Sequence, residues 1–236
     1  MKKIAVFTGA GVSAESGIST YRDITDGLWY NHKVEEVATI DAWKNNREKV
    51  LKFHNMLRGQ LHDVKPNKAH ELIGSLEDDF DVTVSTQNVD ELHEKGGSTK
   101  VYHIHGELMK CKSSVDPSLV YDARGSINIG DKCLKGSQLR PNTVLFGEYP
   151  YFMIESERAI RDADIVLVVG TGFDISYTAG MISNANPTAK IYYVDPLPTR
   201  VLDSYPNLGG RVVYIEEPAT TGVQRVFDEI YENFLG

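Results

Sequence analysis

Short runs of apolar, β-branched residues recur along this chain, and the run at residues 165–169 contains no polar position. A strand of this kind must be covered on both faces, which is typical of a parallel sheet between two layers of helices. The same pattern predicts strands over residues 3–8, 81–85, 100–105, 143–146, 190–194 and 211–215. Amphipathic helices are predicted over residues 41–61, 67–79, 151–162 and 223–234. Strands that alternate with helices indicate an α/β fold with a doubly wound parallel sheet.

Two segments interrupt this alternation. Residues 21–61 separate the first strand from the second by far more than one crossover helix, and residues 107–139 are polar and rich in Gly, Ser and Asp. We expect them to form a second, smaller inserted lobe within a single catalytic domain, 1–236. The large lobe then comprises approximately residues 1–20, 62–106 and 140–236, and the small lobe residues 21–61 and 107–139.

Composition excludes several classes of protein. The formal net charge of −8 over 236 residues argues against broad nucleic-acid binding. No apolar run approaches the roughly 20 residues needed to cross a membrane, and no long apolar stretch follows the two N-terminal lysines, so we expect a cytoplasmic protein. Two cysteines do not suggest a disulfide scaffold. Because no amphipathic segment remains once the sheet is covered, we expect a monomer.

The segment from Gly9 to Ala14, directly after the first strand, matches the dinucleotide pattern G-x-G-x-x-A. Its glycines allow a tight turn and a close approach of backbone N–H groups to a pyrophosphate at a helix N-terminus. A plain glycine-rich turn would look the same. The acidic residue usually found about 20 positions later has no clear equivalent, because Asp23 and Asp26 fall in an apparent loop. An ordinary hydride-transfer enzyme is therefore not favoured.

Polar residues follow several of the other predicted strands. They are Gln87, Asn88 and Asp90 after the second strand, His103 and His105 at the end of the third, Gly170, Thr171 and Gly172 after residues 165–169, and Asp195 after residues 190–194. Ligands of open α/β sheets bind at this edge. Alternation places His103 and His105 on one face, and histidine transfers protons near neutral pH.

Each of these features also has a structural interpretation. Asn88 or Asp90 can cap a helix, a single histidine is more often structural, and Asp195 can simply form a turn before Pro196. If Asp195 instead bonds ribose hydroxyls, it would repel a 2′-phosphate and favour NAD over NADP.

Taken together, the segments resemble the sirtuin family. The resemblance rests on Gly9 to Ile18 with Thr20, Tyr21 and Arg22, on Thr86 to Asp90 with Leu92 and His93, on His105 to Leu108, on Leu139 to Pro141 leading to Phe146, Gly147 and Glu148, and on Gly170 with Thr171. The matches occur in the family's order across residues 4–195. Thr20 to Arg22, with Gly27, Leu28 and Trp29, are most similar to the bacterial and mitochondrial branch that removes acidic acyl groups.

The resemblance implies a Rossmann-like large lobe, a small zinc-bearing lobe and NAD-dependent deacylation of acyl-lysine proteins. His105 would be the general base that activates a ribose hydroxyl, Asn88 would position the ribose and a water, and the products would be nicotinamide, lysine and O-acyl-ADP-ribose. The implied NAD-binding residues are Gly9, Ala10, Gly11, Ser13, Ala14, Gly17, Ile18, Tyr21, Arg22, Trp29, Gln87, Asn88, Asp90, His105, Gly170, Thr171, Gly172 and Asp195. Substrate peptide would pair with Phe146, Gly147 and Glu148 by strand addition.

The sequence departs from the family pattern at the zinc module. The family supplies two Cys-x-x-Cys pairs, whereas Ser114 and Gly136 stand at the partner positions of Cys111 and Cys133. A structural zinc ion needs four ligands, so we predict no zinc, or a weak site completed by other groups.

The acyl pocket departs as well. The acidic-acyl branch uses a Tyr and an Arg three residues apart, and His54 and Leu57 occupy those positions, with Arg58 one residue further. Leucine cannot pair with a carboxylate. A preference for acidic acyl groups would require Arg58 through a one-residue shift, or a protonated His54 at lower pH.

Two other functions use the same residues. An ADP-ribosyltransferase or NAD hydrolase on this fold differs only in what attacks the ribose, and a non-catalytic NAD sensor would bind without cleavage. Intact peptide-strand segments, 139–141 and 146–148, favour the deacylase over the first alternative, and His105, Asn88 and Asp90 together argue against the second.

Overall fold

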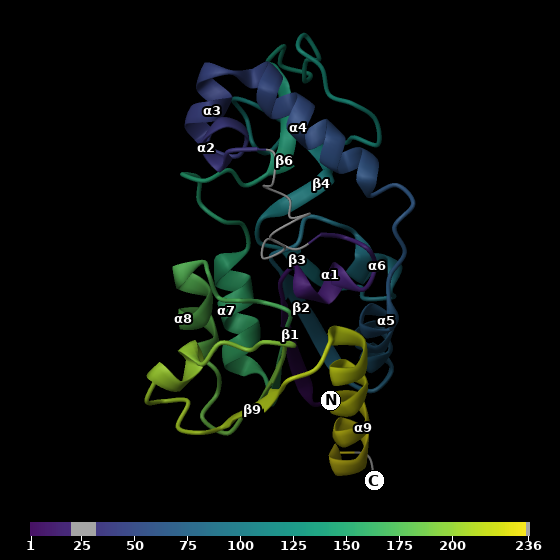
Figure 1. Ribbon diagram of the computed structural model, residues 1–236, viewed down its shortest axis with the longest axis vertical. Coiled ribbons are helices and arrows are strands. Elements are labelled where there is room, and N and C mark those ends of the chain that lie inside the picture. Colours follow the sequence, from purple (N-terminus) through teal and green to yellow (C-terminus); the bar gives the residue numbers. More distant parts are fainter. Residues whose placement is uncertain (20–31, 235–236) are drawn as a thin grey trace.

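The computed structural model describes residues 1–19 and 32–234, and a six-stranded parallel sheet forms its centre (Figure 1). The strand order is β3-β2-β1-β7-β8-β9. The strands are β1 (Lys3–Thr8), β2 (Asp81–Thr86), β3 (Val101–His103), β7 (Ile165–Val169), β8 (Lys190–Val194) and β9 (Val212–Ile215). The doubly wound α/β sheet expected from the apolar strands is confirmed.

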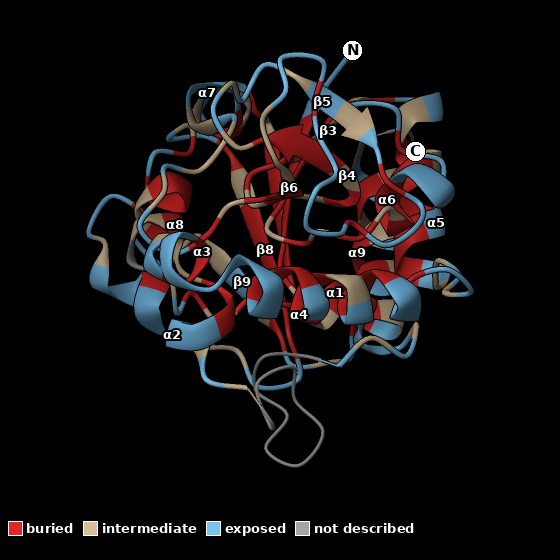
Figure 2. Cartoon of the chain, turned by 90° about the horizontal axis from the view of Figure 1, so that it is seen from above, coloured by how far each residue is buried: buried red, intermediate tan, exposed pale blue. Residues whose placement is uncertain are grey.

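Helices cover both faces of this sheet (Figure 1). One layer contains α1 (Gly11–Ala14), α5 (Lys68–Ser75), η1 (Leu76–Asp78), α6 (Leu92–Lys95) and α9 (Ala219–Phe234), and the other contains α7 (Met153–Asp162), α8 (Ser176–Ser183) and η2 (Val201–Ser204). Strand alternation divides the core between the layers: Ile4 and Val6 pack on the α5–α9 side, whereas Ala5 and Phe7 pack on the α7–α8 side. Figure 2 shows the buried residues gathered along the central strands.

A second, smaller lobe lies beyond the carboxyl edge of the sheet (Figure 1). Its antiparallel sheet has the order β5-β4-β6, formed by β4 (Gly106–Ser113), β5 (Val120–Asp122) and β6 (Leu139–Thr143). Three helices accompany this sheet, α2 (Val34–Val37), α3 (Ile40–Asn45) and α4 (Arg47–Gln60). Since β6 belongs to the small sheet, the lobe boundary that we expected at residue 139 cuts through this strand.

Two predicted elements differ from the structure. The strand expected at residues 143–146 lies earlier in the chain and is β6. Pro141 argues against a strand in the sequence, but β6 is an edge strand, and an edge strand tolerates proline. The single helix expected at 41–61 is two helices, because the Asn46 side chain accepts a hydrogen bond from the backbone N–H of Lys49 and starts α4.

The remaining predicted elements are close to those observed. The strand expected at 100–105 ends at His103, so His105 lies in the turn that leads into β4. Within residues 1–19 and 32–234, no helix is both long enough and apolar enough to cross a membrane.

Candidate active site at the carboxyl edge of the sheet

The two glycine loops pack directly on each other at the point where the strand order reverses, between β1 and β7. The backbone N–H of Gly9 donates to the carbonyl of Val169 at 3.0 Å, and that of Gly11 donates to Gly170 at 2.8 Å. A Cβ atom on Gly11 would lie 2.6 Å from the Cα of Gly170, so no larger residue fits there. This switch point is where open α/β sheets bind nucleotides.

Polar side chains connect the first loop with the segment after β2. The Asn88 amide donates to Ser13 Oγ at 3.0 Å, and Ser13 Oγ donates to Asp90 Oδ2 at 3.1 Å. Burial raises the pKa of Asp90, although hydrogen bonds from Leu92 and Ser13 oppose this shift. The three side chains therefore form a fixed, buried group directly behind the glycine loop.

Beneath this group lies a second layer of buried polar residues. The Thr8 hydroxyl contacts Thr86 Oγ1 at 2.8 Å and His93 Nε2 at 2.9 Å. The rings of His70 and His93 pack edge to face, and burial lowers the pKa of both. These neutral imidazoles support the loop without adding charge next to Asp90.

His105 is held at both ring nitrogens. Nδ1 lies 3.1 Å from the carbonyl oxygen of Gln87, and Nε2 lies 2.7 Å from the hydroxyl of Tyr177 on α8. A carbonyl only accepts, so Nδ1 carries the proton. Burial lowers the pKa of His105, with the Gln87 carbonyl opposing, so the ring is neutral and Nε2 carries the electron pair that base chemistry would use.

In contrast to the neutral His105, His103 carries a proton on both ring nitrogens. Its Nδ1 lies 2.9 Å from the Asn88 carbonyl and its Nε2 lies 2.8 Å from a Glu94 carboxylate oxygen, and both of these partners are acceptors. Burial lowers the pKa of His103, but the bond and charge of Glu94 outweigh it and the net pKa is raised. His103 is therefore an ion-paired structural residue.

The remaining predicted nucleotide-site residues lie on the same edge. The Gln87 amide donates to Thr171 Oγ1 at 2.8 Å, which joins the segment after β2 to the loop after β7. Asp195 is buried and accepts from the Leu197 N–H at 2.8 Å, as in the turn that the sequence also allowed. Ala10 precedes α1, Ala14 ends it, and Gly17 and Ile18 follow it, whereas Tyr21, Arg22 and Trp29 lie outside the described residues.

The three residues considered for the acyl pocket all lie on α4. His54 is buried, its Nδ1 donates to the Val50 carbonyl at 2.9 Å, and burial lowers its pKa to about 4. Leu57 belongs to an apolar cluster with Phe53 and Leu108.

Arg58 faces the interior of the small lobe. It is 1% exposed, its Nε donates to the Leu108 carbonyl at 2.8 Å, and its Nη1 donates to Asn55 at 2.6 Å. Nε and Nη1 thus bind oxygens of its own lobe, while Nη2 is buried without a hydrogen-bond partner.

Residues 146–148 connect the small lobe to α7. The Phe146 N–H and carbonyl are bonded to Ala38 and Ile40, while the residue is 51% exposed. Glu148 forms a bidentate pair with the buried Arg140 at 2.8 and 2.9 Å and also accepts from the Leu145 N–H. The carboxylate of Glu148 is therefore committed to fixing this segment.

The two cysteines are buried and unpaired with each other. Cys111 packs in the apolar core of the small lobe. Cys133 Sγ lies 3.1 Å from Ser137 Oγ, which lies 2.7 Å from Ser113 Oγ. No group of three or more His, Cys, Asp or Glu side chains suited to a metal occurs among the described residues.

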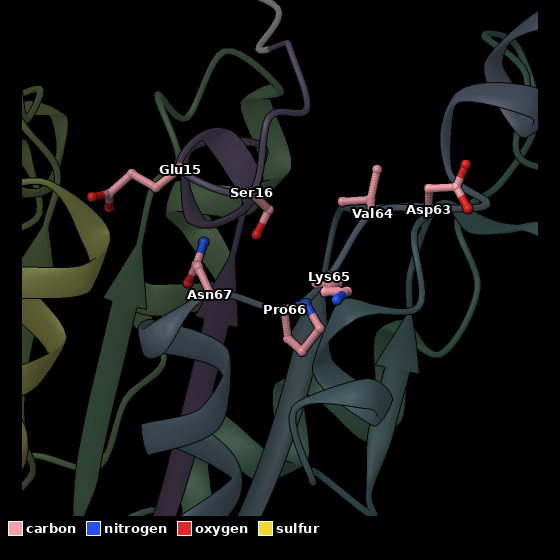
Figure 3. A pocket seen from close by; sticks show the side chains of 7 residues that line it. All are labelled: Glu15, Ser16, Asp63, Val64, Lys65, Pro66 and Asn67. Carbon is pink, nitrogen blue, oxygen red and sulfur yellow. The ribbon is translucent and has the colours of Figure 1, made fainter.

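A cavity of about 490 Å³ opens on the outer side of α1 (Figure 3). It is lined by Glu15, Ser16, Asp63, Val64, Lys65, Pro66 and Asn67. None of the predicted site residues lines it, so it is separate from the group around His105.

Sequence reasoning missed several residues of this site, above all Tyr177, Thr8, His70 and Glu94. Their positions follow no spacing rule, since each reaches the site from a different element. The only signal for Tyr177 was its place shortly after the Gly170–Gly172 loop.

Comparison with known proteins places this architecture in one family. Residues 9–176 match the model of the Sir2 family. A protein of Helicobacter pylori (strain ATCC 700392 / 26695), named NAD-dependent protein deacylase, is 40% identical over 98% of this chain and 99% of its own length. One of Aggregatibacter actinomycetemcomitans with the same name is 44% identical over 84% of this chain and 95% of its own.

Solved structures agree with this assignment. A Sir2 homologue in complex with ADP-ribose superposes with a TM-score of 0.87 at 30% identity, covering 99% of this chain and 94% of its own. A Sir2 homologue in complex with NAD gives 0.83 at 29% identity, covering 98% and 90%. The range that matches the family model includes His105 and the Gln87–Asp90 segment, and the chain belongs to the Sir2 family.

Proposed function

We propose that this protein is an NAD-dependent protein-lysine deacylase that releases nicotinamide and O-acyl-ADP-ribose. The observation that carries the proposal is the neutral His105, whose Nε2 electron pair lies at the carboxyl edge of the sheet, beside the Gln87–Asp90 segment. Bound NAD would supply the ribose carbon to which the acyl oxygen transfers as nicotinamide leaves. The relatives named as deacylases support the same reaction.

The residues of the chain fit a dinucleotide. The Gly9–Ala14 and Gly170–Gly172 loops are free of side-chain bulk where they meet, at the switch point of the sheet. Asp195 at the end of β8 would bind ribose hydroxyls through carboxylate oxygen, and Gln87 and Asn88 would position the second ribose. Asp90, fixed by Ser13, would bind the carboxamide.

His105 would act as a general base. Its Nδ1 proton is held by the Gln87 carbonyl, so the proton taken from a ribose hydroxyl must go to Nε2. A base whose pKa is lowered by burial stays unprotonated at neutral pH and needs no prior deprotonation.

Incubation of the protein with NAD and an acetyl-lysine peptide tests the function. We expect nicotinamide, deacetylated peptide and O-acetyl-ADP-ribose in equal amounts by mass spectrometry. Cleavage of NAD without deacetylation would move the function to ADP-ribosyl transfer or NAD hydrolysis, and binding of NAD without cleavage would make the protein a sensor.

We expect neutral acyl groups to be preferred over acidic ones. His54 is neutral above about pH 4, Leu57 is apolar, and Arg58 is buried with its Nε and Nη1 donors bonded inside the small lobe. A carboxylate buried without a partner is costly, so kcat/KM for a succinyl peptide should be about ten-fold or more below that for a butyryl peptide of the same chain length. Equal values at pH 7 would contradict this pocket assignment.

We propose that the small lobe folds without zinc. Cys111 lies in an apolar core and Cys133 lies beside the Ser137 hydroxyl, whereas a structural zinc site needs four ligands. Addition of a strong chelator should leave the thermal unfolding midpoint unchanged. A lowered midpoint that zinc restores would overturn the proposal.

A further inference from the structure

Tyr177 contacts Nε2 of His105, the ring nitrogen that would have to accept a proton in base catalysis. Its hydroxyl lies 2.7 Å from Nε2, and its ring meets the imidazole edge to face. Tyr177 is the second residue of α8, which packs on the face of the sheet opposite α5 and α9. The contact therefore joins the turn after β3 to an element that is far away in the sequence.

The direction of this hydrogen bond is fixed by its neighbours. Nδ1 of His105 must donate to the Gln87 carbonyl, so a neutral ring has no proton on Nε2. Burial raises the pKa of Tyr177 to about 12, so its phenol keeps its proton and donates it to Nε2. The bond thus occupies the only electron pair with which His105 can accept a proton.

We propose that Tyr177 is a positioning residue that caps His105 Nε2 in the ligand-free protein and is displaced when the ribose hydroxyl binds. The inference rests on the proposed role of His105 as general base. One electron pair accepts one strong hydrogen bond, so a substrate hydroxyl and the Tyr177 hydroxyl compete for it. The cap keeps the imidazole in the tautomer that the reaction needs until substrate takes its place.

The loop before α8 connects this cap with the nucleotide site. Thr171 accepts a hydrogen bond from the Gln87 side chain, and the Gln87 carbonyl holds the other nitrogen of His105. Between Thr171 and Tyr177, Phe173 has a φ of +57°, a left-handed conformation that strains a bulky residue. We expect a ligand that relaxes this conformation at residues 171–173 to move the Tyr177 hydroxyl away from His105.

A titration of the ligand-free protein tests the cap without any turnover. We would follow the His105 ring protons by NMR in the wild type, in Tyr177→Phe and in Tyr214→Phe, whose hydroxyl bonds Asp203 at the surface. Within the part of the chain that the structure describes, Tyr177 is the titratable group in contact with His105. The other influences on the pKa of His105 are burial, which lowers it, and the Gln87 carbonyl, which raises it.

A donor to Nε2 stabilises the neutral ring, so its removal should raise the pKa of His105 in Tyr177→Phe and leave it unchanged in Tyr214→Phe. An unchanged titration in Tyr177→Phe overturns the cap.

The pH dependence of turnover then distinguishes displacement from a permanent bond. The profile of kcat/KM reports the free enzyme and that of kcat reports the substrate complex. In Tyr177→Phe the acid limb of kcat/KM should move to higher pH while that of kcat stays, and KM for NAD should fall by roughly two- to ten-fold. An equal move of both limbs would mean that Tyr177 stays bonded in the complex, and displacement would be wrong. If the His105 titration changes in Tyr177→Phe but the wild-type protein shows no deacylation, the cap would stand and the base role of His105 would be refuted.

Discussion

Replacing His105 by alanine should lower the rate of deacylation by about 10²- to 10⁴-fold, the usual contribution of a positioned general base. The loss follows because the variant lacks Nε2, the proton acceptor that lies beside the Tyr177 hydroxyl at this edge of the sheet. NAD binding should persist, because the glycine loops and the Ser13–Asn88–Asp90 group make no hydrogen bond to the His105 ring. Single-turnover kinetics and equilibrium binding of NAD measure the two effects separately.

The matched control is His62→Ala, which removes an exposed imidazole from the linker between α4 and α5 and should leave the rate unchanged. The wild-type pH profile gives a second check. Because burial lowers the pKa of His105, its base function is present at neutral pH and is lost only as the pH falls below the ordinary histidine range. A rate loss shared by both variants would contradict the assignment.

Replacing Glu148 by alanine should lower the free energy of unfolding by about 3 kcal/mol, since it leaves a buried guanidinium without its carboxylate. The Arg140 side chain is 5% exposed and loses both of its bonds to Glu148. The Thr143 carbonyl and the Trp43 ring remain as its neighbours, but neither supplies a negative charge. Denaturant unfolding followed by circular dichroism measures the change.

Glu48→Ala is the matched control, because the Glu48–Lys52 pair is exposed on both sides and exposed pairs contribute little. The pH dependence carries a definite sign. Burial raises the pKa of Glu148, but the bond and charge of Arg140 outweigh it, so the net pKa is lowered. The stabilisation is therefore complete above the ordinary glutamate pKa and is lost as pH falls through the lowered value. Equal destabilisation by both variants would show that the buried pair has no special weight.

Much of the architecture could be predicted because it follows from local pattern. The apolar run Ile165–Val169 could only be a strand covered on both faces, and the strand bounds at Lys3–Thr8 and Lys190–Val194 are those of the structure. The position of the glycine loop after β1 also follows from sequence. The strand β6 was not predicted because Leu139–Thr143 has poor local strand propensity. This segment is a strand only because it pairs with β4.

The candidate site shows a sharper division. The residue types around His105 and their order in the sequence are sufficient to identify the Sir2 family. The spacing of His103 and His105 could not assign their protonation, because the acceptors that decide it, Glu94 and Gln87, reach them through the fold.

The amino-acid sequence was enough to predict the parallel sheet and to identify the family. The contacts of His105 with Tyr177, and the ion pairs that hold His103 and Glu148, could be seen only in the folded protein. The difference comes from how far apart in the sequence the interacting residues are. Hydrophobic periodicity acts between near neighbours and is visible in the sequence, whereas burial and hydrogen-bond partners depend on residues that meet only after the chain has folded.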